Sequence, residues 1–133
     1  MIRKIIRPLL QEIYLSDPWK MLVCCMLLNL TNRKQVDTIR KQLFDKYKTP
    51  QDMMNAKHEE LADILKPLGL YNRRANSLRK MSEGYINGFN SVDELYGIGQ
   101  YAKDSWDIFQ NSNLNIKPED KVLQEYLRQE ALT

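Results

Sequence analysis

The stretch Leu95-Tyr96-Gly97-Ile98-Gly99-Gln100-Tyr101-Ala102-Lys103-Asp104 decides the fold. Two glycines flank one apolar residue, and residues that favour a helix follow. Because glycine lacks a Cβ and tolerates positive φ, Gly97 and Gly99 predict a tight turn whose N–H groups point outward. A helix that begins near Gln100 adds unpaired N–H groups and its positive dipole end, so the turn and the helix start form a pocket for one phosphate. The same spacing also occurs in an ordinary helix–turn–helix link, where glycines only give clearance.

The size and composition of the chain predict one globular domain over residues 1–133. Apolar residues make up 43% and charged residues 28% of the sequence, which is typical of a soluble protein. The longest apolar run, Met21 to Leu28, ends at Asn29 and is too short to span a bilayer. We see no signal peptide and expect an intracellular protein without membrane contact.

The charge is weakly basic, with a net value of +3. Basic residues gather in the middle of the chain, which fits either a nucleic-acid surface or ordinary solvated helix faces. They are Arg33, Lys34, Arg40, Lys41, Arg73, Arg74, Arg79 and Lys80.

The cysteines and the histidine offer no metal site. Cys24 and Cys25 are neighbours, so they point in different directions on a helix, and we expect buried free thiols. Two cysteines cannot supply the four thiolates of an iron–sulfur cluster. His58 is the only histidine, and no second ligand stands at metal spacing from it, so we expect no zinc site.

The hydrophobic spacing predicts an all-α fold of about eight to nine helices and shows no useful strand alternation. Asp17-Pro18 opens a helix to about Asn29, which is apolar nearly all round and so is the buried central helix. Before it we expect a helix within Ile2–Ile13, which Pro8 limits. After it we expect a helix that is capped by Thr31 or Asn32 and reaches Tyr47, a short helix from Thr49-Pro50, a helix around Leu61–Leu65, and the helix Tyr71–Asn87 with its arginines outward. The last three expected helices are a short one with a Ser91–Glu94 capping box, one that follows the glycine turn, and one from Pro118 through Leu127.

Asp120 is the carboxylate that could do chemistry. Pro118 fits the first turn of the last helix, and Asp120 follows within that turn. A carboxylate there is stabilised by the helix dipole. If the glycine turn grips a phosphate and Asp120 lies beside it, the carboxylate faces a sugar–base bond. A helix-start acid that only stabilises its helix gives the same pattern.

Several stretches together resemble the helix-hairpin-helix DNA glycosylase superfamily, most of all the cluster-free glycosylase domain of the methyl-CpG-binding thymine/uracil mismatch glycosylases. They cover nearly the whole chain in the family's order and with similar spacing. The stretches are Leu10-Gln11-Glu12, Asp17-Pro18-Trp19-Lys20, Leu28-Asn29, Leu65-Lys66-Pro67-Leu68-Gly69-Leu70-Tyr71, Leu95-Tyr96-Gly97-Ile98-Gly99-Gln100-Tyr101, Asp104-Ser105 and Pro118-Glu119-Asp120.

The resemblance implies how DNA is held. In the family, the hairpin residues, here Gly97, Ile98, Gly99 and Gln100, hold a DNA phosphate through backbone amides, often with a monovalent cation on the carbonyl side. Lys103 lies one turn into the helix that follows and could face a phosphate. No other cofactor is implied.

The resemblance also implies roles in base removal. The catalytic aspartate corresponds to Asp120. Tyr101 stands where bifunctional members carry a nucleophilic lysine, as it does in the thymine glycosylase branch. Gln11, with the backbone of Leu10 nearby, matches the glutamine that reads the flipped pyrimidine. Leu70 matches the wedge that fills the gap the nucleotide leaves.

One position departs from the family branch. An arginine follows Leu-Asn there and lies near the orphan guanine, whereas this sequence has Leu30. Arg33, one turn later, is a candidate substitute for DNA contact. The departure leaves the opposite-base preference open.

These observations predict a monofunctional glycosylase that flips thymine, uracil or a C5-modified pyrimidine out of double-stranded DNA opposite guanine, hydrolyses the N-glycosidic bond and leaves an abasic site. We expect a monomer, nuclear if the source is eukaryotic. Two alternatives stay open. One is a non-catalytic helix-hairpin-helix DNA-binding module, and the other is a helical interaction protein without a nucleic-acid role.

Overall fold

The computed structural model describes residues 5–133, and within that range every regular element is a helix. Residues 5–133 form eight α-helices and two short 3-10 helices, so the predicted all-α class is confirmed. The elements are α1 (Leu10–Ile13), α2 (Pro18–Leu27), α3 (Arg33–Lys46), α4 (Pro50–Met54), α5 (His58–Leu65), η1 (Lys66–Leu68), α6 (Tyr71–Asn87), η2 (Val92–Glu94), α7 (Gln100–Phe109) and α8 (Lys121–Ala131). In the part of the chain that is described, no helix has the length and apolarity that a membrane crossing needs.

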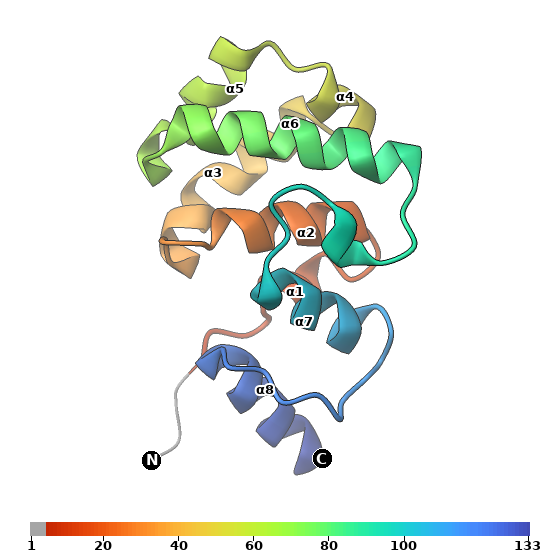
Figure 1. The fold of residues 1–133 in the computed structure, drawn as a ribbon. Coiled ribbons are helices and arrows are strands. Elements are labelled where there is room, and N and C mark those ends of the chain that lie inside the picture. The colour runs from red at the N-terminus through yellow and green to blue at the C-terminus, as the bar shows by residue number, and fades with distance from the viewer. Residues whose placement is uncertain (1–4) are drawn as a thin grey trace.

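The helix α2 is the central helix, as its apolar sequence predicts. It lies between α6 on one side and α7 on the other, while α4 and α5 pack beyond α6 (Figure 1). Trp19 on α2 donates a hydrogen bond of 3.0 Å from Nε1 to Ser82 Oγ on α6, which satisfies a buried polar pair inside the core. Both Cys24 and Cys25 are buried free thiols, which confirms the expectation for them.

Three helix starts follow the local sequence. Asp17 accepts a hydrogen bond from Lys20 N and precedes Pro18 at the first position of α2. Asn32, rather than Thr31, caps α3 and forms a capping box with Gln35. Thr49 caps α4 in the same manner. Each cap forms because a short polar side chain accepts one of the unpaired amides within three residues.

Other boundaries differ from the prediction. Residues 2–4 of the first predicted helix lie outside the described residues, and within its described part, 5–13, only Leu10–Ile13 is helical. The helix α2 ends at Leu27, before Asn29. The predicted capping box at Ser91 does not form, because the Ser91 hydroxyl donates to Asp93 instead and Glu94 accepts from the amide of Asn90.

The start of the last helix is also later than predicted. Pro118 lies ahead of α8, and Asp120 is the N-cap residue rather than a member of the first turn. The acceptor role of its carboxylate explains the shift, since Asp120 Oδ2 accepts from Leu123 N at 2.9 Å.

The helix α8 lies at the lower end of the molecule, below α7 (Figure 1). The ring of Tyr126 on α8 stacks on Phe109 of α7 with ring centroids 4.8 Å apart. Arg7 lies over Tyr126 and bridges Glu130 on α8 to Glu12 on α1, at 3.2 and 2.6 Å. These contacts fix the helix whose first turn Asp120 caps.

Candidate active site

The glycine turn between η2 and α7 has the predicted tight shape, but only one glycine needs positive φ. Gly97 has φ +77, and Ile98 N donates to Leu95 O at 3.2 Å to close the turn. A Cβ on Gly97 would lie 2.8 Å from Met26 Cε on α2, so this position also allows a close approach. Gly99 has φ −96 and is the N-cap residue of α7 without a side-chain cap.

The first turn of α7 therefore keeps amide donors for an anion. No side chain caps this helix, and its first backbone bond runs from Lys103 N to Gly99 O. The amides of Gln100 and Tyr101 precede that bond and point out of the helix start. The amide of Ile98 is engaged inside the turn, and its half-buried side chain packs on the core. The amides that are free to donate thus lie at the start of α7, directly after the turn at Gly97 and Gly99.

A cavity of about 900 Å³ opens beside this turn. Its wall is built from the segment before α1, the end of α2, the start of α6, the glycine turn and the residue before α8. Nine of the eleven residues predicted to form the site line it, namely Leu10, Gln11, Arg33, Leu70, Gly97, Gly99, Gln100, Tyr101 and Asp120. Ile98 and Lys103 are absent from this wall.

A buried hydrogen-bond network forms the floor of the cavity. Gln11 is only 2% exposed, and its Nε2 donates to Tyr101 Oη at 2.7 Å and to Ser105 Oγ at 3.1 Å. Since both amide hydrogens are used inside the protein, the carbonyl oxygen is the part of Gln11 left for a ligand. Burial raises the pKa of Tyr101 far above its ordinary value, so its hydroxyl stays neutral.

Asp120 faces the same cavity from the start of α8. Its Oδ2 accepts from Leu123 N, and Asp120 is only partly buried. The other carboxylate oxygen, Oδ1, is therefore the one left for chemistry. The chain thus presents one carboxylate, one set of free amides and one buried amide–phenol pair around a single space.

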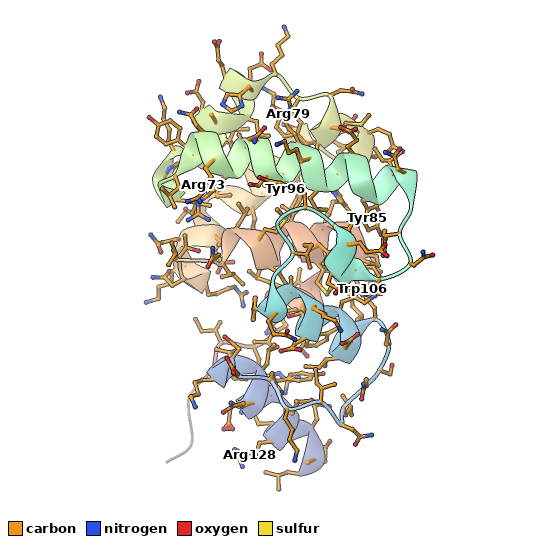
Figure 2. All side chains as sticks on the ribbon, in the orientation of Figure 1. Arg73, Arg79, Tyr85, Tyr96, Trp106 and Arg128 are labelled. Atoms are coloured by element: carbon orange, nitrogen blue, oxygen red, sulfur yellow. The ribbon has the colours of Figure 1, made fainter. Side chains whose placement is uncertain are left out.

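The two candidate basic residues are both engaged within the chain. The Arg33 guanidinium lines the cavity, donating to Pro8 O at 2.8 Å and to Asp37 at 2.9 Å. Lys103 pairs with Asp107 at 3.2 Å. Arg73 also lines the cavity and is exposed, and Figure 2 shows it near the N-terminal end of α6. Tyr96, on the turn in Figure 2, lies under the ammonium group of Lys80 at 4.8 Å.

Sequence reasoning missed Arg74, because the prediction placed the arginines of α6 outward. Arg74 is 8% exposed and donates to backbone carbonyls. The helical spacing could have revealed this, since Leu78 follows Arg74 by four residues on the inward face.

A hairpin cation would need carbonyl oxygens. Leu95 O and Gly99 O already accept backbone hydrogen bonds, whereas no backbone bond within residues 5–133 reaches Gly97 O or Ile98 O. Two free carbonyls in one turn are suitable donors for a hard monovalent ion. They would hold it by charge–dipole attraction, and the ion would add positive charge near the phosphate.

The fold and the cavity define a helix-hairpin-helix protein. The chain belongs to the family described as HhH-GPD superfamily base excision DNA repair protein, which matches residues 23–129. It is 38% identical over 120 residues to the methyl-CpG-binding domain protein 4-like protein of Arabidopsis thaliana, covering 89% of this chain and 27% of that protein.

Two other comparisons agree. A thymine/uracil-DNA glycosylase of Pyrobaculum aerophilum is 36% identical over 95 residues, which cover 65% of this chain and 41% of that protein. The solved structure of a thermostable thymine-DNA glycosylase matches with a TM-score of 0.67 and 22% identity, covering 78% of this chain and 60% of that one, and shows the shared fold. This chain thus spans less than half of the two sequence relatives.

Proposed function

We propose that this chain is a monofunctional DNA glycosylase that removes thymine, uracil or a C5-modified pyrimidine opposite guanine and leaves an abasic site. The observation that carries the proposal is the single cavity onto which Asp120, the glycine turn and the Gln11–Tyr101 pair all open. The family and the names of the relatives support the same activity. The protein acts as a monomer on double-stranded DNA.

The glycine turn holds the strand. Amides of Gly99, Gln100 and Tyr101 bind one phosphate, and exposed Leu70 fills the space that the extruded nucleotide leaves. Extrusion costs a few kcal/mol and is easiest at a mismatch, so a G·T or G·U pair opens more readily than A·T.

The pyrimidine is read on the cavity floor. The free carbonyl of Gln11 accepts the N3–H of thymine or uracil, whereas cytosine presents an acceptor there. The neutral Tyr101 hydroxyl fixes the amide in this orientation through the 2.7 Å hydrogen bond.

Asp120 drives the bond cleavage. As the bond from C1′ to the base nitrogen breaks, its electron pair leaves with the base and the sugar gains oxocarbenium character, which the carboxylate stabilises. Asp120 then accepts a proton from water as the water oxygen bonds to C1′, and the departing base is protonated in turn. Among residues 5–133 no lysine lines the cavity wall, and residue 101 is a tyrosine, so none of these residues supplies an amine for a Schiff base.

The test is Asp120→Asn with duplexes carrying G·U or G·T, assayed by alkaline strand cleavage. Asparagine still caps α8, so the variant folds, and we expect base release to slow on the order of 100- to 1,000-fold while duplex binding persists. Asp17→Asn is the matched control, because Asp17 also caps a helix by accepting from the amide three residues on, lies away from the cavity and should keep full activity.

Three outcomes would count against this function. If Asp120→Asn releases base as fast as the unaltered chain, Asp120 is not catalytic. Binding of mismatched duplex with no base release from any substrate would favour a non-catalytic DNA-binding module. Covalent trapping on DNA with borohydride would contradict the monofunctional assignment.

A further inference from the structure

Two leucines at the rim of the cavity share an unusual backbone. Leu30 has φ 62 and is 80% exposed, and Leu70 has φ 50 and is 49% exposed. Both line the cavity. A branched side chain in the left-handed region is disfavoured, and exposure of a large apolar group gains nothing in water. Two such residues at one rim therefore need a common explanation.

The leucines come from separate segments. Leu30 lies in the connection from α2 to α3, and Leu70 is the N-cap residue of α6. Neither segment is long, and both approach the start of α6. Whatever fixes their relative position must contact both segments.

Arg74 is the residue that contacts both. Its Nε donates to Gly69 O at 2.8 Å, and its Nη2 donates to Asn29 O at 3.1 Å. These two carbonyls belong to the peptide units immediately before Leu70 and Leu30. Because each unit also contains the amide nitrogen of its leucine, holding the carbonyl restricts the φ rotation of that leucine. A third contact, Nη2 to Leu68 O at 3.5 Å, adds to the first segment.

The guanidinium pairs with backbone only. Arg74 is 8% exposed, and no carboxylate of the described chain forms an ion pair with it. Burial lowers its pKa accordingly. A buried cation without an acidic partner costs stability. A planar guanidinium reaches two carbonyls from separate nitrogens, whereas all the donors of a lysine are on one nitrogen. The arrangement favours a positional role over a stabilising one.

We propose that Arg74 is a positioning residue that holds Leu30 and Leu70 as a rigid pair, so that both side chains enter the DNA together when the nucleotide is extruded. The inference rests on the proposed function. Leu70 fills the vacated space, and Leu30 packs against the neighbouring base of the opposite strand. Both contacts are apolar, and their geometry depends on one side chain that touches neither DNA nor substrate.

The test compares Arg74→Met and Arg74→Lys with the unaltered chain. Duplex and single-stranded DNA containing uracil are assayed in single turnover, and folding is checked by thermal unfolding. A single strand has no stacked duplex for a wedge to enter. We therefore expect release of uracil from the duplex to slow on the order of 100-fold, which is the loss that a misplacement of about an ångström causes. Release of uracil from the single strand should be nearly unchanged. Arg79→Met is the control for lost charge, since Arg79 lies on the same helix and is not part of the cavity wall.

A second readout needs no catalysis. In an Asp120→Asn background, 2-aminopurine next to a mismatch reports unstacking at saturating protein. Arg74→Met should abolish most of the fluorescence rise, and Arg79→Met should keep it. A rise in this background, together with no base release by the unaltered chain, would leave this proposal standing while the proposed activity failed.

Truncating the leucines completes the test. Leu30→Ala and Leu70→Ala should each reduce the fluorescence rise, but they should have little further effect in the Arg74→Met chain, because coupled residues are non-additive. Equal slowing on duplex and single strand, an unchanged rise in Arg74→Met, or loss of folding in both Arg74 variants would overturn the proposal, the last because Arg74 would then be structural.

Discussion

The left-handed turn at Gly97 predicts a stability difference between the two hairpin glycines. Alanine at Gly97 must adopt φ +77, which costs about 1–2 kcal/mol for a residue with a Cβ. Its Cβ would also lie 2.8 Å from Met26 Cε. That methyl group is the end of a flexible side chain and can shift. The clash therefore adds little to the free-energy cost of the substitution, and most of the cost comes from the left-handed backbone.

Gly99→Ala provides the matched control. Gly99 has φ −96, and a Cβ there meets no atom within 4 Å. We expect Gly97→Ala to unfold about 4–8 °C below the unaltered chain, from the backbone cost and the size of the domain. Gly99→Ala should stay within about 0.5 kcal/mol, as open surface positions do.

Thermal unfolding followed by circular dichroism measures both variants, and urea unfolding supplies the free energies. The reasoning fails if Gly97→Ala unfolds at the temperature of the unaltered chain. It also fails if Gly99→Ala loses as much stability, because the left-handed backbone would then not be the constraint.

Two further predictions concern stability. Burial raises the pKa of Glu12, but the hydrogen bond from Arg7, the hydrogen bond from the amide of Leu9 and the charge of Arg7 together outweigh it, so the net pKa lies below the ordinary 4.5. This stabilisation is complete above pH 4.5 and is lost as pH falls through the folded pKa, so urea unfolding from about pH 5 to 3 should show a steeper loss in the unaltered chain than in Arg7→Ala. Trp19→Phe removes the donor to buried Ser82 and should cost about 1–3 kcal/mol beyond the lost ring volume. Trp106→Phe, at a half-buried ring, should cost less in the same urea experiment, and an equal loss would contradict the role of the hydrogen bond.

The helix caps show what local sequence can predict. Asp17, Asn32 and Thr49 all cap helices, because each interaction is complete within three residues. The predicted capping box at Ser91 does not form, and the reason is also local. Two acids follow Ser91, so its hydroxyl has a competing partner in Asp93, and spacing alone does not rank the two.

The site depends on contacts that span the chain. The glycine turn and Asp120 were predicted as separate features, and only folding places them on one cavity. Arg74 was misassigned because an arginine on a helix is usually exposed, while its partners, the carbonyls of Gly69 and Asn29, are backbone groups that no sequence pattern displays. Side-chain identity predicts charge and size, whereas the acceptors of a buried cation follow from tertiary structure.

The N-cap role of Asp120 has an evolutionary consequence. One oxygen of its carboxylate closes α8, and asparagine would do that equally well, yet the codons for aspartate and asparagine differ by a single base. Selection for a well-folded chain therefore cannot by itself preserve the proposed role of Asp120 in base removal. Under the proposed function, a lineage could lose base removal in one mutational step and keep a stable domain.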